Sequence, residues 1–215
     1  MPVIAISREI GTGAAELAGQ VAAELGAALV DRRIIDEIAR RLQIPQEEAE
    51  ALDETAPKFL ERLLSAVARA GPDYGADAGW SEWTPPHPDD PAFDVRRASR
   101  SITEEVMKAA ALTRNVVIVG RGATFLLKDD PRVLRVFLRG SLAARTAGVM
   151  KTLRLDANAA KRRVKESDVN WGAYVRAFYH VDWRDPANYD LVLDTGRLGT
   201  EAAARVILAA AARFG

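Results

Sequence analysis

A glycine-rich turn near the N-terminus has the composition of a phosphate-binding loop. The turn and the residues after it are Gly11, Thr12, Gly13, Ala14, Ala15 and Glu16. It follows the apolar run at residues 3–6 and precedes apolar residues at helical spacing. At such a strand–helix junction, backbone N–H groups and the positive end of the helix dipole converge and bind phosphate without a side-chain charge. The turn alone fits equally well an ordinary tight connection in which glycine supplies a positive φ.

The turn lacks the lysine of the usual phosphate-binding motif, GxxxxGK[ST]. With Gly13 as the second glycine, the lysine position holds Ala14. The hydroxyl position then holds Ala15, or Glu16 in the variant with one extra residue. The lysine neutralises charge on the β- and γ-phosphates, so its absence matters for phosphoryl transfer. Arg8 is the nearest cation, and we expect it to substitute, although a surface position at a strand end fits it equally well.

Charged residues follow two further apolar runs. Asp31 comes after residues 28–30, and Arg121 stands between two glycines after residues 115–119. In an open parallel sheet, ligands collect beyond the carboxyl ends of the strands. Asp31 also fits the N-cap of a following helix, which we take as its first role and which does not exclude a ligand contact. A charge between two glycines after a buried strand has little structural purpose, which favours a ligand contact for Arg121.

A basic set lies in the helix that we expect Asp156 to cap, and its members are Lys161, Arg162, Arg163 and Lys165. Residues three or four apart share a helix face. Such a face can close over a transferring phosphoryl group, but a solvated face is the commoner explanation of a basic run. A second helix is expected at residues 168–180, and it contains Arg176.

Apolar periodicity predicts strands that alternate with helices. The strands are expected at residues 3–6, 28–30, 115–119, 133–138 and 189–194. The helices between and after them are expected to start near residues 14, 34, 95, 142, 157, 168 and 200. This alternation indicates one three-layer α/β/α domain over residues 1–215, with a parallel five-stranded sheet covered on both faces. The segment at 71–94, rich in proline and tryptophan, is expected to be a long loop that is either functional or disordered. Its tryptophans, Trp80 and Trp83, are expected to be packing anchors first, with folding over a ligand as the alternative.

Composition excludes several classes of protein. Thirty Lys and Arg balance thirty Asp and Glu, so no general basic field attracts nucleic acid or an anionic membrane. With no cysteine and two histidines, disulfides and most zinc sites are excluded. No apolar run reaches membrane-spanning length, and a cytoplasmic location is the default expectation. The sequence leaves a monomer and a homodimer equally open.

Four segments together resemble the cytidylate kinase-like family: ISREIGTGAAELAGQVAAELGAALVDRRIIDEIAR, VVIVGRGATFLL, RVFLRGSLAARTAGV and SDVNWGAYVRAFYHVDWRDPANYDLVLDT. The resemblance implies a P-loop kinase core, a helical monophosphate-binding insertion at about 32–98 and a lid at about 156–185. The family commonly lacks the lysine too. The residues after Asp168, Val169 to Trp171, depart from the family by lacking lid cations, and Trp183 is expected to fix the return to the last strand.

The resemblance also implies roles for individual residues. ATP and Mg²⁺ are expected at residues 8–16, with Glu16 as a candidate magnesium ligand. The acceptor, a small molecule such as CMP, is expected at Asp31, Arg32, Arg121 and Arg145. The transferring phosphoryl group is expected to meet Arg8, Arg121, Arg162 and Arg176. A kinase of another small molecule, or a nucleotide-binding protein without turnover, stays open as an alternative.

Overall fold

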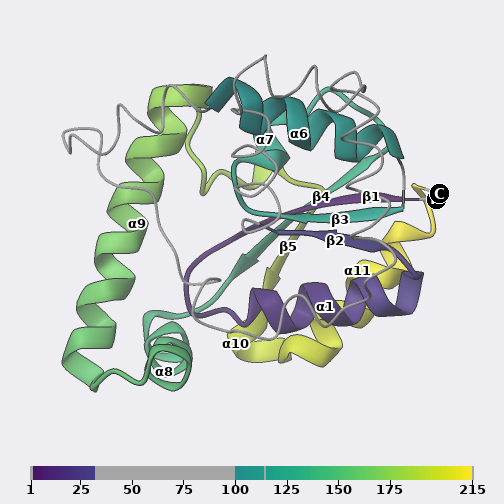
Figure 1. Cartoon of the computed structure of the whole chain (residues 1–215). Helices are drawn as coiled ribbons and strands as arrows, with labels where there is room; N and C mark the ends of the chain where they lie inside the picture. The colour runs from purple at the N-terminus through teal and green to yellow at the C-terminus, as the bar shows by residue number, and fades with distance from the viewer. Residues whose placement is uncertain (1, 32–99, 114, 215) are drawn as a thin grey trace, which may run out of the picture.

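The computed structural model describes residues 2–31, 100–113 and 115–214 (Figure 1). The expected monophosphate-binding insertion, Arg32 within it and the segment at 71–94 lie outside these residues.

Five parallel strands form one sheet in the order β2-β3-β1-β4-β5. Their bounds are β1 Val3–Arg8, β2 Ala28–Val30, β3 Val116–Val119, β4 Val133–Arg139 and β5 Leu191–Asp194. Every residue of β3 is buried, as expected of a strand covered on both faces. The prediction of a five-stranded parallel sheet is therefore confirmed.

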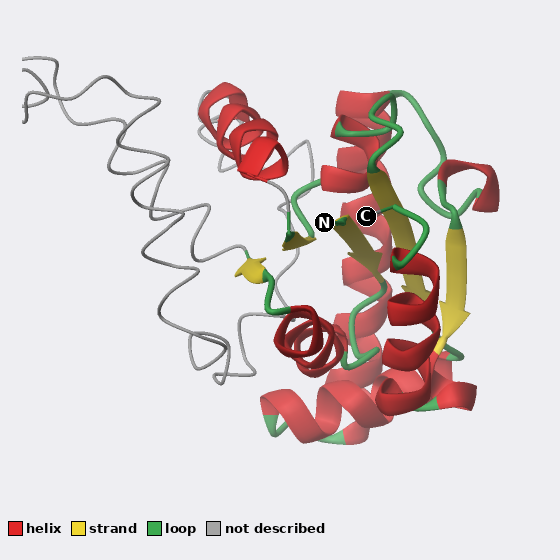
Figure 2. Cartoon of the chain, turned by 90° about the vertical axis from the view of Figure 1, so that its right-hand side faces the viewer, coloured by secondary structure: helices red, strands yellow, loops and turns green. Residues whose placement is uncertain are grey.

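Helices cover both faces of this sheet (Figures 1 and 2). The helices α1 (Ala14–Leu25) and α11 (Thr200–Ala211) lie on one face, and α6 (Arg100–Thr113) and α7 (Ala123–Leu126) lie on the other. Alternate residues of β1 belong to the apolar cores on the two faces of the sheet. Val3 and Ala5 pack on the side of α6, and Ile4 and Ile6 pack on the side of α1. The helix α1 ends at Gly26, whose φ of 56° is left-handed, as the sequence predicts.

Two further helices lie beyond the carboxyl ends of the strands (Figure 1): α8, Leu142–Leu153, and α9, Ala157–Tyr179. Asp156 caps α9 as predicted and accepts from the Ala159 N–H at 2.9 Å. The prediction of two helices over this range is wrong, because α9 runs on through Asp168. Asp168 does not cap a new helix, since its carboxylate binds an arginine instead.

Short helices complete the return from α9 to the C-terminus. They are a 3₁₀ turn, η3, at Pro186–Asn188 and one turn of helix, α10, at Thr195–Leu198. The periodicity did not predict these turns or α7, because each is too short to show a helical repeat. Within the described ranges, no helix combines the length and apolarity that a bilayer span requires.

Candidate functional site

Two glycine-rich turns lie side by side at the carboxyl ends of neighbouring strands. The first, residues 8–16, runs from the last residue of β1 into the first turn of α1 and is called the phosphate loop below. The second, residues 120–122 after β3, is called the Gly-Arg-Gly turn. The Gly120 N–H donates to the Ile6 carbonyl at 2.9 Å, which joins the second turn to the strand that leads into the first. A donor and an acceptor bound at these turns would therefore be neighbours.

Backbone geometry makes the phosphate loop suitable for an anion. Gly11 and Gly13 have φ values of 84° and 70°. Gly13 is the N-cap of α1, and no side chain caps this helix. The backbone N–H groups of its first turn can therefore donate to a ligand. A Cβ on Gly11 would lie 2.2 Å from the Arg145 carbonyl oxygen, and one on Gly13 2.7 Å from Thr200 Cγ2. The loop therefore needs both glycines, and its donors fit a phosphate group.

A carboxylate at the start of α1 and a hydroxyl at the start of α11 supply oxygen atoms of the kind that magnesium binds. Glu16 is exposed, and its Oε1 accepts from the Thr200 hydroxyl at 3.3 Å. Magnesium takes oxygen ligands and usually receives only one or two from the protein, the rest coming from water and substrate phosphates. No group of three His, Cys, Asp or Glu side chains suited to a metal is present in the described part of the chain. Thr12 does not join these oxygens, because its buried hydroxyl donates to the Glu9 carbonyl at 2.8 Å.

Four charged side chains form an ion cluster beside the phosphate loop: Glu9, Arg145, Asp168 and Arg184. Arg145 Nη1 and Nη2 donate to the two Asp168 oxygens at 3.0 and 2.5 Å, and Nη1 lies 3.3 Å from Glu9 Oε1. Arg184 Nη2 lies 3.1 Å from the same Glu9 oxygen and 2.8 Å from Asp168 Oδ2. The cluster joins the loop, α8, α9 and the segment before β5.

Arg145 also holds the backbone of the loop. Its Nε donates to the Ile10 carbonyl at 3.0 Å, and its side chain is only 4% exposed. On the other side of the cluster, the Gly140 N–H donates to Glu9 Oε2 at 3.0 Å. The expected contact of Arg145 with the acceptor would require it to leave these partners; in the structure it holds the backbone of the phosphate loop.

The Gly-Arg-Gly turn has three consecutive residues with positive φ: 80°, 54° and 77°. For Arg121 this left-handed backbone costs about 1 kcal/mol or more, because its Cβ crowds the following carbonyl. Tyr179, the last residue of α9, packs against the turn: a Cβ on Gly122 would lie 2.5 Å from its hydroxyl oxygen. That hydroxyl donates to the Arg121 carbonyl at 3.5 Å. The strain and the ring together fix where the Arg121 side chain leaves the backbone.

An aromatic cluster supports this second turn. Its buried members are Phe125, Phe137, Val175, Trp183 and Tyr189, with Trp171, Tyr174 and Tyr179 packed against them. Trp183 meets Phe137 edge to face at 5.5 Å, and the Tyr189 hydroxyl donates to the Trp183 carbonyl at 2.6 Å. Burial raises the pKa of Tyr189 far above its usual range, against a smaller opposing effect of Ser7, so this donor keeps its proton at neutral pH. Trp183 thus fixes the return from α9 to β5, as the sequence predicts.

The other predicted site residues are distributed along the same edge of the sheet. Arg8 ends β1 half-buried, and Asp31 is buried directly after β2. Arg162 and Arg176 are exposed on α9 and fourteen residues apart, which is about 21 Å along the axis of a continuous helix. These two arginines therefore cannot contact one phosphoryl group at the same time.

Sequence reasoning missed the ion cluster. Glu9 and Arg184 drew no functional interpretation, and Asp168 was expected only to begin a helix. The four residues come from four separate segments, so no spacing along the chain connects them. The one local signal was Glu9 itself, a carboxylate three residues beyond the predicted buried strand at 3–6, where an unpaired charge would be costly if it were buried.

The fold and the loop define a P-loop kinase-type protein: a parallel α/β/α sheet with a glycine turn between its first strand and first helix. The sequence profile of the cytidylate kinase-like family matches residues 3–197, and the chain belongs to this family. The resemblance found in the four sequence segments is thereby confirmed.

Individual relatives agree with this assignment. The chain is 30% identical over 111 residues to the cytidylate kinase of Methanopyrus kandleri and 24% identical over 108 residues to that of Sulfurisphaera tokodaii. These matches cover 48% and 50% of this chain, and 58% and 59% of the two relatives, so less than two thirds of each relative is spanned. A solved structure of an uncharacterized protein from Eubacterium ventriosum has a TM-score of 0.69 at 19% identity over 99% of both chains, which supports the fold.

Proposed function

We propose that the protein is a nucleotide kinase that transfers the γ-phosphoryl group of ATP to a small acceptor, a nucleoside monophosphate such as CMP. The observation on which this rests is the uncapped N-terminus of α1 behind the positive-φ glycines of the phosphate loop. Membership of the cytidylate kinase-like family supports a kinase of nucleotides. The choice of ATP as the donor and of CMP as the acceptor goes beyond what family membership alone supports.

On the donor side, the phosphate loop binds the triphosphate through backbone N–H groups at Gly11 to Glu16. The Glu16 carboxylate and the Thr200 hydroxyl would hold Mg²⁺, which would supply positive charge to neutralise the phosphates. Ile10 packs against Ala160 and Val164 of α9, so the first half of α9 belongs to this side. Arg162 lies in that half, and we assign it to the donor phosphates.

On the acceptor side, Arg121 binds the acceptor phosphate from the Gly-Arg-Gly turn, and Asp31 contacts the acceptor from the end of β2. Arg176 lies one turn before Tyr179, which packs on the Gly-Arg-Gly turn, so we assign it to this side. An acceptor oxygen then attacks the γ-phosphorus in line, the bond to the β–γ bridging oxygen breaks, and ADP leaves with the electron pair. The chain's own contribution is to position both phosphates and stabilise charge.

A second candidate is a nucleotide-binding protein of kinase fold that does not turn over. The observation in its favour is Ala14 at the lysine position, buried at 2% exposure. A kinase of another small acceptor uses the same donor side and differs only in the acceptor contacts.

An assay of ADP release over a panel of nucleoside monophosphates tests the proposal. We expect CMP to stimulate release most. Arg121→Gly, which keeps the left-handed backbone, should abolish this stimulation while ATP affinity by calorimetry stays within about twofold, because the donor contacts remain. Arg132→Gly serves as the control at a distant turn.

Three results contradict parts of this proposal. ATP binding without any stimulated release favours the second candidate. Loss of ATP affinity in Arg121→Gly assigns this arginine to the donor. No ATP binding in the wild type removes the proposal altogether.

A further inference from the structure

The phosphate loop offers backbone donors but no cation of its own at the lysine position, and the ion cluster lies directly beside it. We infer that Arg184 is the mobile cation of the phosphate site. It exchanges its ion pairs with Glu9 and Asp168 for oxygens of a bound triphosphate, while Arg145 holds the two carboxylates in place. The inference rests on the proposed function of the loop and gives Arg184 the role of the missing lysine, for which the sequence had suggested Arg8.

Arg184 lies close enough to act on this loop. Its Nη2 is 3.1 Å from the carboxylate of Glu9, the residue that follows β1 and enters the loop. The Arg184 side chain is 48% exposed, so it can turn toward a ligand without opening the core. Its guanidinium lies 4.7 Å from the ring centroid of Trp183, a buried residue that anchors its backbone.

The two arginines of the cluster differ in their freedom to move. Arg145 is 4% exposed and binds Asp168 through both terminal nitrogens and the Ile10 carbonyl through Nε. Arg184 uses Nη2 alone for both of its carboxylates. The N–H groups on its Nε and Nη1 make no hydrogen bond to side chains or backbone in the described ranges. These donors of the planar guanidinium group suit phosphate oxygens.

Departure of Arg184 leaves no buried charge without a partner. Asp168 keeps its two bonds to Arg145. Glu9 keeps the Gly140 N–H on Oε2 and Arg145 Nη1 near Oε1. Stranding a buried carboxylate is the costly step in breaking an ion pair, and Arg145 prevents it here. The cluster can therefore release one cation while it keeps the loop in shape.

The part of α9 directly after Asp168 supplies no cation. Asp168 is followed by Val169, Asn170 and Trp171, and the next cation along the helix is Arg176, eight residues from Asp168, about 12 Å along the helix axis. Before Asp168 the nearest cation is Lys165, which is exposed. Arg184 thus provides positive charge beside the part of α9 between Asp168 and Arg176, where the helix itself has none.

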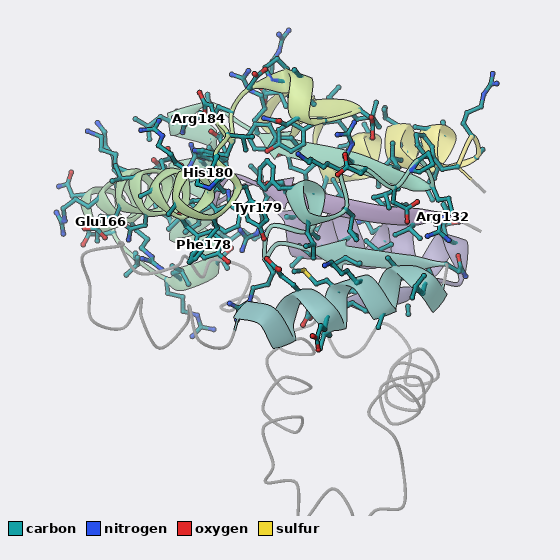
Figure 3. All side chains as sticks on the ribbon, turned by 90° about the horizontal axis from the view of Figure 1, so that it is seen from above. Arg132, Glu166, Phe178, Tyr179, His180 and Arg184 are labelled. Atoms are coloured by element: carbon teal, nitrogen blue, oxygen red, sulfur yellow. The ribbon has the colours of Figure 1, made fainter. Side chains whose placement is uncertain are left out.

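Calorimetry with inorganic triphosphate and with ATP tests the inference on the full chain. We expect Arg184→Gln to weaken both ligands about tenfold, the effect of one charge-assisted hydrogen bond. Arg184→Lys should recover part of the loss, because it restores charge without the fork. Arg132→Gln is the matched control: Arg132 is 40% exposed, pairs with Asp130 and lies at the opposite end of the molecule (Figure 3). It should leave both affinities unchanged, and thermal unfolding should show all three variants folded.

The outcomes separate this inference from the proposed function. If Arg184→Gln binds triphosphate and ATP within twofold of the wild type, the role of Arg184 is overturned, whatever the turnover. If triphosphate binding depends on Arg184 but no acceptor stimulates ADP release, the inference holds and the kinase proposal fails. If the wild type binds neither ligand, both are overturned.

Discussion

The two glycine-rich turns of this molecule lie at adjacent strand ends but are held by opposite means. Charges hold the phosphate loop: Arg145 ties Ile10 and Glu9 to α9 by directed hydrogen bonds and ion pairs. A ring holds the Gly-Arg-Gly turn: Tyr179 packs on Gly122 and lies 5.4 Å from Phe125, centroid to centroid. Both turns use left-handed glycines, so the difference lies in their supports.

This difference teaches how each turn can respond to a ligand. The buried Arg145 fixes the phosphate loop in one arrangement, because moving this arginine would take the buried cation away from Glu9 and Asp168. On the proposed function, the phosphate loop is therefore preorganised for the triphosphate of the donor. Tyr179 supports the Gly-Arg-Gly turn by ring packing and one hydrogen bond of 3.5 Å, so on the proposed function this turn should adjust to a bound acceptor more readily than the phosphate loop adjusts to a donor. Substitutions in the two supports should separate these behaviours.

The largest effect is expected from Arg145→Met. It removes the buried cation and leaves Glu9 and Asp168 with the exposed Arg184 as their remaining cation in the cluster, which should lower the free energy of unfolding by about 3–5 kcal/mol. Urea denaturation at pH 7 measures the loss. Arg184→Gln removes the other cation from the same carboxylates. Because Arg184 is exposed, its loss should lower the free energy of unfolding by about 1 kcal/mol or less. Equal losses in the two variants would show that burial does not distinguish the two arginines.

A smaller effect is expected from Gly148→Ala in α8. Its new Cβ would lie 2.2 Å from the Gly11 carbonyl oxygen, a backbone atom that cannot turn aside. Overpacking of this kind costs about 1–3 kcal/mol, and it should also weaken triphosphate binding because the loop must shift.

The control for Gly148→Ala is Gly19→Ala, within α1. No heavy atom lies within 4 Å of its built Cβ, so alanine there should stabilise the chain by about 0.5–1 kcal/mol through helix propensity. Unchanged phosphate affinity in Gly148→Ala would mean that the ligand does not use the loop geometry seen here.

Most of the fold could be predicted from the sequence. The five apolar runs and the helical repeats are local patterns, and β2, at Ala28–Val30, agrees with its predicted bounds at both ends. The phosphate loop was predictable for the same reason, since its glycines and the following helix are contiguous. The continuous helix α9 was not, because aspartate commonly begins a helix and nothing local shows that Asp168 pairs with Arg145.

The supports of the two turns could not be predicted either. Glu9 and Arg184 are 175 residues apart in the sequence, and Gly122 and Tyr179 come together only in the folded structure. Such contacts depend on tertiary placement, for which one sequence contains no periodic signal. Arg121, in contrast, was recognisable as a candidate because its two glycine neighbours are local, and its contact with an acceptor stays a prediction.

The smallest effect is expected from Gly122→Ala, on the aromatic side. Its Cβ would lie 2.5 Å from the Tyr179 hydroxyl, the far end of a side chain that can move, so the main cost is the left-handed φ of 77°, about 1 kcal/mol. In a Tyr179→Leu background the ring is absent, and the same substitution should cost only this backbone part. A double-mutant cycle by urea denaturation measures the difference. Tightly coupled neighbours give coupling energies on the order of 2 kcal/mol. A value of about 2 kcal/mol or more would show that Tyr179 cannot move. The Gly-Arg-Gly turn would then be as rigid as the phosphate loop, and the contrast between ionic and aromatic support would fail.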